Sequence, residues 1–230
     1  MTTDKARPMA LVVGALSGAG QDLCRELARR HFDLLLMDLD GSGLFHLRKE
    51  LQAASPVHVQ LFQGHVERQG HRQELQQVLH TVGVKLDVVL FIPGLEAKRE
   101  RNGAGGEARQ GVEKGHLALD DLLLGGILPA MVQEGNGYVL SLVKASLLDP
   151  HCPLAAPAAA AAALALYSQA MSQAWSHAHI AFTVGILGKE LETWCDPKDQ
   201  VAGTEVTAAK KLLAALFSRK ELVKAPRWHL

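Results

Sequence analysis

Small residues with the spacing of a phosphate-binding turn follow the first apolar run of the chain. Residues 14–20 read Gly-Ala-Leu-Ser-Gly-Ala-Gly, after an apolar run at 9–13 and before a segment with helical periodicity. Glycines let a chain turn tightly and bring bare backbone against a pyrophosphate, whose charge is stabilised by the N–H groups that begin a helix. The turn therefore predicts a dinucleotide site formed by Gly14, Ser17, Gly18, Ala19 and Gly20.

A carboxylate follows the second apolar run. Asp38 lies 18 residues beyond Gly20. At about this distance from a glycine turn, a carboxylate accepts hydrogen bonds from an adenosine ribose and repels a 2′-phosphate. The pattern therefore favours NAD over NADP. The alternative is a strand-to-helix turn that binds no ligand, beside an ordinary surface aspartate.

Other reactive side chains are less well placed for chemistry. His151 and Cys152 are adjacent, but neighbouring side chains point apart and no third residue orients the histidine. His177 and His179 could bind a metal only with further ligands that the sequence does not identify. The three cysteines have neither disulfide nor metal-ligand spacing. We expect reduced, buried thiols and no metal.

Alternating apolar runs and helical segments must position these residues. The pattern predicts strands near 9–13, 33–38, 57–62, 86–92, 137–143, 179–185 and 221–225. It predicts helices near 18–30, 41–53, 67–82, 112–133, 155–177 and 203–218. This order is typical of an α/β protein: a single Rossmann-like domain over 1–230, with a doubly wound parallel sheet of about seven strands and helices on both faces. Ligands of such sheets bind at the carboxyl ends of the strands.

Two segments have unusual composition. Residues 95–111 are rich in charge and glycine without apolar periodicity, which predicts a mobile loop. Ala158–Ala163 is an alanine run, which favours a helix whose small side chains let another helix approach closely. A homo-dimer or tetramer through the central helices is therefore expected.

The overall composition excludes several classes of protein. The chain has 24 Lys and Arg against 24 Asp and Glu, so it is not a polybasic nucleic-acid binder. With 48% apolar and 21% charged residues, it is too apolar to be disordered. The first apolar run is too short for a signal peptide or a membrane helix. We expect a cytoplasmic protein that binds neither nucleic acid nor membrane.

The spacing Gly14-x-x-x-Gly18-x-Gly20, followed by Asp38, resembles the short-chain dehydrogenase/reductase (SDR) family. The resemblance runs nearly end to end. Residues 86–94 are similar to the family's fourth strand, 137–144 to the strand that carries its catalytic serine, and 180–188 to its sixth strand and Pro-Gly turn. The resemblance implies a nicotinamide dinucleotide cofactor and oxidoreductase chemistry.

The residues that carry the family's chemistry are absent from the matching positions. The family uses a tyrosine as general acid, a lysine four residues later, a serine on the neighbouring strand and an asparagine in the central helix. The matching positions are Pro157, Ala161, Lys144 and, to within a residue or two, His116. Pro157 suits the first turn of a helix, where its missing N–H leaves no intrahelical bond unmade.

The two tyrosines of the chain do not substitute for the missing one. Tyr167 lies ten residues past Pro157, which is about 15 Å along a helix axis. Tyr138 lies six residues before Lys144, which is about 20 Å along a strand. Neither hydroxyl reaches the expected reaction centre.

Lys144 and His116 are the groups that could support different chemistry. An amine at the end of a buried strand loses solvation, becomes easier to deprotonate, and can act as acid, base or imine former. A histidine near the cleft can exchange a proton at neutral pH. The alternatives are that Lys144 reaches solvent or pairs with Asp149, and that His116 lies on a helix surface.

The resemblance also implies three further cofactor contacts. His65 stands where many members have an aspartate near the adenine. Gly94 ends Phe91-Ile-Pro-Gly, which replaces the Asn-Asn-Ala-Gly stretch that lines the family's cofactor site. Thr193 matches, offset by one residue, the position that binds the nicotinamide carboxamide.

Three functions are compatible with these residues. The first is an SDR-fold protein that retains a dinucleotide pocket, has lost hydride transfer, and acts as a binding, regulatory or scaffold subunit, either alone or in a hetero-oligomer with an active relative. The second is an NAD(P)-dependent oxidoreductase, or a repurposed enzyme that uses Lys144 and His116. In the third, Phe91, Ile92 and Pro93 fill the pocket, and neither cofactor nor substrate binds.

Overall fold

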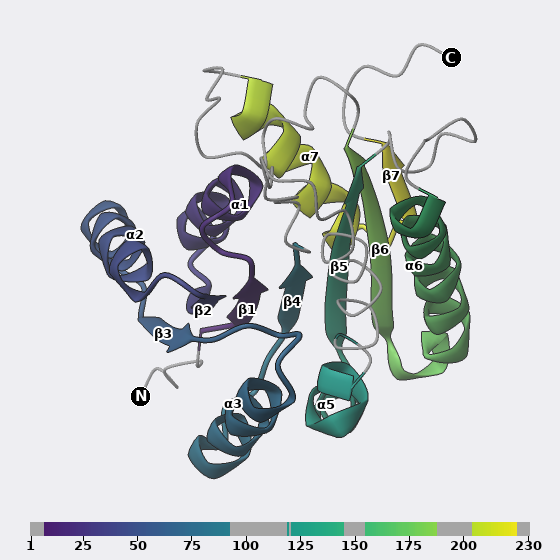
Figure 1. Ribbon diagram of the computed structural model, residues 1–230, viewed down its shortest axis with the longest axis horizontal. Coiled ribbons are helices and arrows are strands. Elements are labelled where there is room, and N and C mark those ends of the chain that lie inside the picture. The colour runs from purple at the N-terminus through teal and green to yellow at the C-terminus, as the bar shows by residue number, and fades with distance from the viewer. Residues whose placement is uncertain (1–6, 93–118, 120, 145–154, 188–203, 225–230) are drawn as a thin grey trace, which may run out of the picture.

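The computed structural model describes residues 7–92, 119, 121–144, 155–187 and 204–224 (Figure 1). Within them, seven strands form one sheet in the order β3-β2-β1-β4-β5-β6-β7, and every pairing is parallel. The strands are β1 Met9–Val13, β2 Asp33–Asp38, β3 Val59–Gln63, β4 Val88–Phe91, β5 Gly137–Lys144, β6 Ile180–Leu187 and β7 Leu222–Lys224. The predicted parallel sheet of about seven strands is confirmed.

Helices cover both faces of this sheet. One face carries α1 Gly18–Arg29, α2 Gly41–Ala54 and α7 Thr204–Phe217, and the other carries α3 Gln69–Val82, α5 Leu128–Glu134 and α6 Ala155–Ala174. A short 3₁₀ turn, η3 Ser176–Ala178, leads from α6 toward β6. Each face has its own buried apolar cluster, because successive strand side chains point to opposite faces. The predicted doubly wound architecture is therefore confirmed.

The chain reverses its direction of winding beside β1. The first three strands run outward from β1 in the order β1, β2, β3, and β4 then returns to pair with the other side of β1. A crevice forms at such a switch point, outside the carboxyl ends of the strands. We call the side of the sheet where all strands end the carboxyl edge, and the opposite side the amino edge.

The central helix differs from its prediction over residues 112–133. Positions 112–118 lie outside the described residues, as does the predicted mobile loop at 95–111. Where the helix is described, Leu123–Ile127 forms a π-helical segment, η1, and the backbone of Gly126 leaves helical geometry. Two adjacent glycines weaken a regular helix, and here they coincide with a wider turn. The helix ends after Glu134, at Gly135 in the left-handed conformation.

None of the described helices combines the length and apolar character that a membrane crossing requires.

Candidate functional site

The turn between β1 and α1 can be built only with glycine at its first position. Gly14 has a φ of +79°, in the left-handed region that L side chains rarely adopt. A Cβ on this residue would also collide with the carbonyl oxygen of Ile92, at the end of β4. The turn therefore lies directly against the neighbouring strand, at the switch point.

Gly20 and Ser17 fix the start of α1 above this turn. A Cβ on Gly20 would collide with the carbonyl oxygen of Gly14, so its absence lets the helix begin close to the strand. The Ser17 hydroxyl donates to the Gly14 carbonyl oxygen at 2.8 Å and accepts from the Gly20 N–H at 3.0 Å. The N–H groups of Gly18 and Ala19, in the first turn, have no intrahelical acceptor. They give the carboxyl edge the positive end of a helix dipole.

Asp38 lies beside this turn, as its position in the sequence predicts. One carboxylate oxygen, Oδ2, accepts from the Leu16 N–H at 3.0 Å, and the other, Oδ1, accepts from the Leu39 N–H at 2.7 Å. The carboxylate is partly exposed. Because each carboxylate oxygen has two acceptor sites, both oxygens keep capacity for a further donor. The sequence does not reveal the contact with Leu16, because it depends on a backbone N–H.

His65 lies further along the carboxyl edge, where β3 ends. The preceding residue, Gly64, donates its N–H to the carbonyl oxygen of Asp38 at 2.9 Å, which connects the two strand ends. The Nδ1 atom of His65 accepts from the Glu67 N–H at 3.2 Å, and the His65 N–H donates to Nδ1 of His71 at 2.9 Å. His65 therefore shapes the turn into α3, a role that its sequence position did not reveal. The sequence likewise gives no sign that Nδ1 of His71 accepts the His65 N–H.

The other predicted site residues are not brought together in the described part of the chain. Gly94, His116 and Thr193 lie outside it, as do His151 and Cys152. Lys144 is the last residue of β5, with its Cα opposite Leu187, so its backbone lies at the carboxyl edge. Its side chain is not described. No three His, Cys, Asp or Glu side chains are grouped as metal ligands among the described residues.

The helix that would carry the family's tyrosine and lysine is α6. Pro157 is its third residue, in the first turn, where proline was predicted to be tolerated. Ala161 follows one turn later. The backbone of both positions is therefore near the carboxyl edge, where α6 begins.

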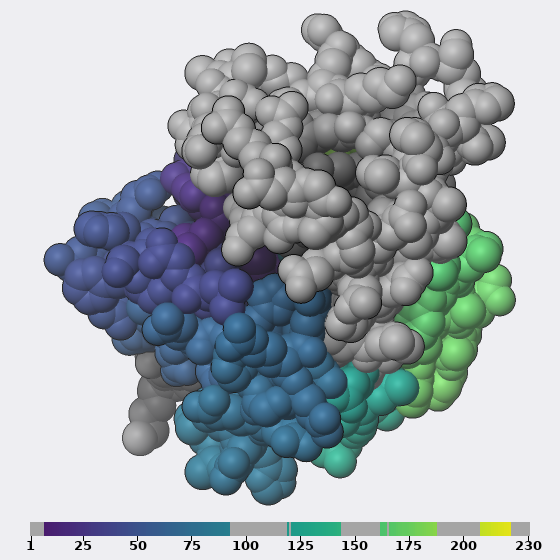
Figure 2. All heavy atoms as spheres, in the orientation of Figure 1, coloured from purple at the N-terminus to yellow at the C-terminus, as the bar shows by residue number. Residues whose placement is uncertain are grey.

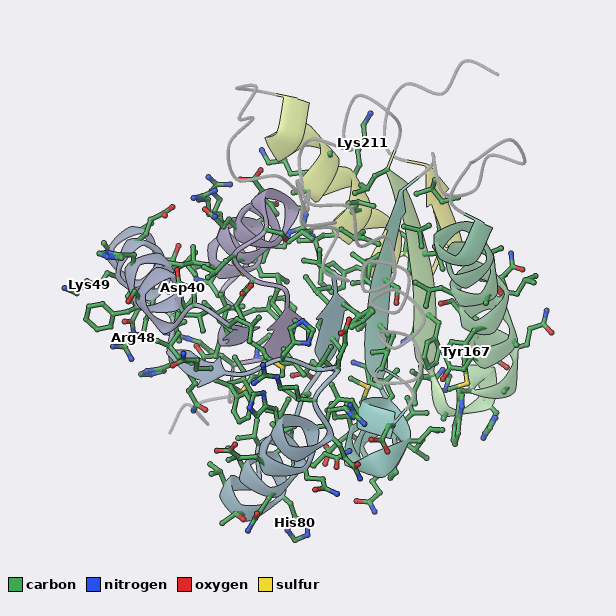
Figure 3. All side chains as sticks on the ribbon, in the orientation of Figure 1. Asp40, Arg48, Lys49, His80, Tyr167 and Lys211 are labelled. Atoms are coloured by element: carbon green, nitrogen blue, oxygen red, sulfur yellow. The ribbon has the colours of Figure 1, made fainter. Side chains whose placement is uncertain are left out.

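Both tyrosines lie away from that edge. Tyr138 is the second residue of β5, at the amino edge, where its ring meets Phe217 edge-on at 5.3 Å and lies under the Arg219 guanidinium at 5.0 Å. Tyr167 lies along α6 (Figure 3), beyond the first three turns, and its hydroxyl oxygen is buried. These positions agree with the sequence argument that neither hydroxyl reaches the carboxyl edge.

Phe91 and Ile92 belong to the core. Phe91 is fully buried in the apolar cluster beneath α3, α5 and α6, while Ile92 is buried in the cluster beneath α1. Their side chains alternate between the faces, as strand residues do. The Phe91 side chain therefore lies on the face opposite α1, whereas Ile92 is buried directly against Gly14 of the turn. The third residue that was considered as filling for the nucleotide pocket, Pro93, lies outside the described residues.

Cys24 is a buried thiol of α1, close to the turn in the sequence. Cys24 is fully buried in α1, and burial raises the pKa of its thiol. The neutral thiol is therefore the stable form, as expected for a buried, reduced cysteine. Arg25 beside it joins α1 to α2 through Glu50, at 2.6 Å, and this hydrogen bond raises the pKa of the guanidinium.

Solved structures share this fold, although no family model and no curated protein matches the chain. A bulky-bulky ketone specific alcohol dehydrogenase from Comamonas testosteroni has a TM-score of 0.77 at 18% identity, over 97% of this chain and 87% of that one. A short-chain dehydrogenase from Sphingobium yanoikuyae, in complex with NADPH, has a TM-score of 0.75 at 20% identity, over 97% and 89%. A putative NAD(P)-dependent gluconate 5-dehydrogenase from Beutenbergia cavernae, with bound NADP, has a TM-score of 0.75 at 17% identity, over 96% of each chain. At identities of 17–20%, these TM-scores show that the chain shares the fold of these dehydrogenases.

Proposed function

We propose that this chain binds a nicotinamide dinucleotide at its carboxyl edge and acts as a binding, regulatory or scaffold subunit that has lost the family's hydride transfer. The geometry of the β1–α1 turn carries the proposal. Gly14 and Gly20 let the turn pack tightly against Ile92 and the start of α1 pack tightly against the turn, and Asp38 stands beside them. This combination of a glycine turn, a helix start and a carboxylate is the fingerprint of a dinucleotide site.

Each part of the turn has a role toward the ligand. The N–H groups of Gly18 and Ala19 would stabilise the charge of the pyrophosphate. The Asp38 carboxylate would accept the ribose hydroxyls with the acceptor sites that Leu16 and Leu39 leave open. The same negative charge would repel a 2′-phosphate, so we propose NAD as the ligand. Bound NADPH and NADP in two of the similar structures support a dinucleotide but not this choice; the preference for NAD depends on Asp38.

The proposed loss of hydride transfer depends on the positions matched by resemblance. Proline and alanine, at 157 and 161, have no side-chain group that can donate a proton to an alkoxide or assist one that does. The amino-edge position of Tyr138 and the distance of Tyr167 along α6 support the same conclusion. Without a matched donor, about 10²–10⁴ in rate is missing.

The second candidate function is an NAD(P)-dependent oxidoreductase, and the similar dehydrogenases support it equally. In this reading Lys144, at the carboxyl end of β5, or His116 takes the role of the proton donor. Absorbance of NADH, followed with a panel of ketones and alcohols, separates the two functions. Turnover that disappears in Lys144→Ala favours the enzyme, and absence of turnover alongside NAD binding favours the binding subunit.

Assembly through the central helices is also proposed. Leu124 in η1 and Leu166 in α6 are 53% and 68% exposed, and both belong to the same helical layer. Large exposed apolar side chains mark interaction surfaces when they cluster. A second copy of this chain or an active relative would cover them.

Calorimetric titration with NAD and NADP tests the proposed ligand. We expect saturable binding of NAD and weaker binding of NADP. No heat with either dinucleotide at millimolar concentration would overturn the binding function. NADP binding tighter than NAD binding would overturn the role of Asp38 and leave the dinucleotide site intact.

A further inference from the structure

A second hollow lies between α3 and the η1–α5 helix, on the same face of the sheet as α6 but toward the amino edge. Figure 2 shows the surfaces of α3 (blue) and α5 (teal) side by side. The hollow has a volume of about 270 Å³. Its lining includes Val84, Lys85 and Leu86, which lead into the start of β4, and Gln133 and Glu134, which precede β5. It is therefore separate from the glycine turn, which lies where the strands end.

Polar contacts connect the two sides of this hollow at both of its ends. At one end, Arg72 pairs with Asp121 at 2.8 Å, and the Gln76 amide donates to the Asp121 carbonyl oxygen at 2.9 Å. At the other end, Lys85 pairs with Glu134 at 2.5 Å. The hollow therefore lies between two sets of contacts that connect its opposite walls.

Two glycines of the π segment, Gly125 and Gly126, line the hollow. A Cβ on Gly125 would meet the end of the Gln76 side chain, which lies close against this glycine. A Cβ on Gly126 would meet no atom within 4 Å. π-helical segments occur frequently at functional sites, because they displace one turn of a helix and open space beside it.

The residues that line the hollow indicate which class of ligand it could bind. Leu79, Leu86 and Ile127 are buried and provide an apolar floor. The polar rim includes the neutral amide of Gln133 and the imidazole of His80, which lies near the end of α3 (Figure 3). The two charged residues of the rim, Lys85 and Glu134, are paired with each other. A charged group held over the apolar floor would lose its hydration and would find no unpaired counter-charge among these lining residues.

We propose that this hollow is a second ligand site, which takes a small uncharged molecule with one ring-sized apolar body and an amide or hydroxyl group. The apolar body would displace water from the floor, and the polar group would hydrogen-bond to the rim. Pockets for drug-sized ligands span roughly 300–1,000 Å³, so a volume just below that range suits a single ring. The site is independent of dinucleotide binding.

Protein-detected NMR with benzamide tests the site, with benzoate and benzamidine as charged compounds of nearly the same shape. We expect benzamide to shift the backbone amide signals of Gly125, Gly126 and Ala130, with a dissociation constant of roughly 1 mM, as ring-sized ligands allow. Benzoate and benzamidine should bind at least about tenfold more weakly, because charge has no partner there. No shift of these signals at saturating benzamide, or equal binding of all three compounds, would overturn the proposal.

Matched variants separate occupancy of the hollow from a general effect on the protein. Ala130 is an exposed helical residue that lines the hollow, so Ala130→Leu fills it while keeping a strong helix former. Ala53→Leu makes the same change at an exposed position of α2, on the opposite face of the sheet. Benzamide affinity should fall at least about fivefold in Ala130→Leu, since a leucine side chain occupies the ring's space, and stay unchanged in Ala53→Leu. Unchanged binding in Ala130→Leu, with that variant folded, contradicts the site.

Discussion

At the scale of single residues, Asp38 contributes both to the structure of the β1–α1 turn and to the proposed binding of the ribose. Its carboxylate accepts two backbone N–H groups, one from the β1–α1 turn and one from the residue that follows β2. A charged acceptor held in this way is fixed in position before any ligand arrives, which reduces the entropy cost of binding. The same residue therefore holds the turn, and in the proposed function it would also disfavour a 2′-phosphate.

Asp38→Asn should weaken NAD binding about tenfold and reduce the preference for NAD over NADP. An amide keeps one acceptor but loses the charge, and a hydrogen bond to a charged group contributes about 1.5–3 kcal/mol. Asp33→Asn is the matched control: Asp33 begins the same strand and accepts the His58 N–H at 2.8 Å, but it lies at the amino edge. Calorimetry on both variants measures the difference. Equal effects of the two substitutions would mean that only net charge or strand stability matters.

Cys24 gives the protein a predictable loss of stability in alkali. Because burial raises the pKa of this thiol, the folded state keeps its proton at a pH where the unfolded chain loses it. Stability from this group is complete below roughly pH 8.5, the ordinary range of a thiol, and is lost as pH rises above it, by up to about 1.4 kcal/mol per pH unit. Urea unfolding at pH 7 and pH 10 should show a larger loss for the wild-type chain than for Cys24→Ala. The same loss in both proteins would contradict burial as the cause.

At the scale of elements, hydrophobic periodicity predicted the strands and helices that position the site. Strands β1 and β2 have the predicted bounds, and α1 begins at the predicted residue, because apolar runs end abruptly at glycine and aspartate there. The proximity of Asp38 to the glycine turn follows from parallel pairing, since adjacent parallel strands end at the same edge.

Other features were not predictable from periodicity. The π segment at Leu123–Ile127 coincides with close packing of Gly125 against Gln76 of α3, a contact between residues far apart in the sequence. The role of His65 in the turn before α3 depends on hydrogen bonds to backbone atoms. Such local geometry has no periodic signal.

The β1–α1 turn provides an element-scale prediction. Gly14→Ala should lower the free energy of unfolding by about 1–3 kcal/mol or more. The positive φ is strained for alanine, and the alanine Cβ would meet the Ile92 carbonyl oxygen. Gly70→Ala is the control, since Gly70 lies in α3 and a Cβ there meets nothing within 4 Å. That change should leave stability equal or raise it by up to about 1 kcal/mol. Chemical denaturation measures both, and a harmless Gly14→Ala would disprove the tight packing of the turn against β4.

At the scale of the whole molecule, the proposals place three separate surfaces on one fold. The carboxyl edge holds the glycine turn and Asp38, whereas the hollow between α3 and α5 opens toward the amino edge. The layer that contains η1 and α6 also exposes large apolar side chains, Leu124 and Leu166. The proposed subunit therefore has a nucleotide edge, a small-molecule hollow and a helical face for assembly.

Leu166→Glu should convert an oligomer of this chain into a smaller species. A charged side chain at a helical contact cannot be buried without a partner, so the contact weakens by several kcal/mol. Phe45→Glu is the control: Phe45 is 40% exposed but lies on α2, in the opposite helical layer. Light scattering should show a dimer or tetramer for the wild-type chain and Phe45→Glu, and a lower mass for Leu166→Glu. A monomeric wild-type chain would remove the self-assembly proposal.

A crystal structure of the chain with NAD tests the central claim most directly. We predict that the pyrophosphate lies within hydrogen-bond distance of the Gly18 and Ala19 N–H groups, with the adenosine ribose hydroxyls on the Asp38 carboxylate. NAD bound elsewhere, or crystals grown at saturating NAD with the turn empty, would contradict the assignment of this edge as a dinucleotide site.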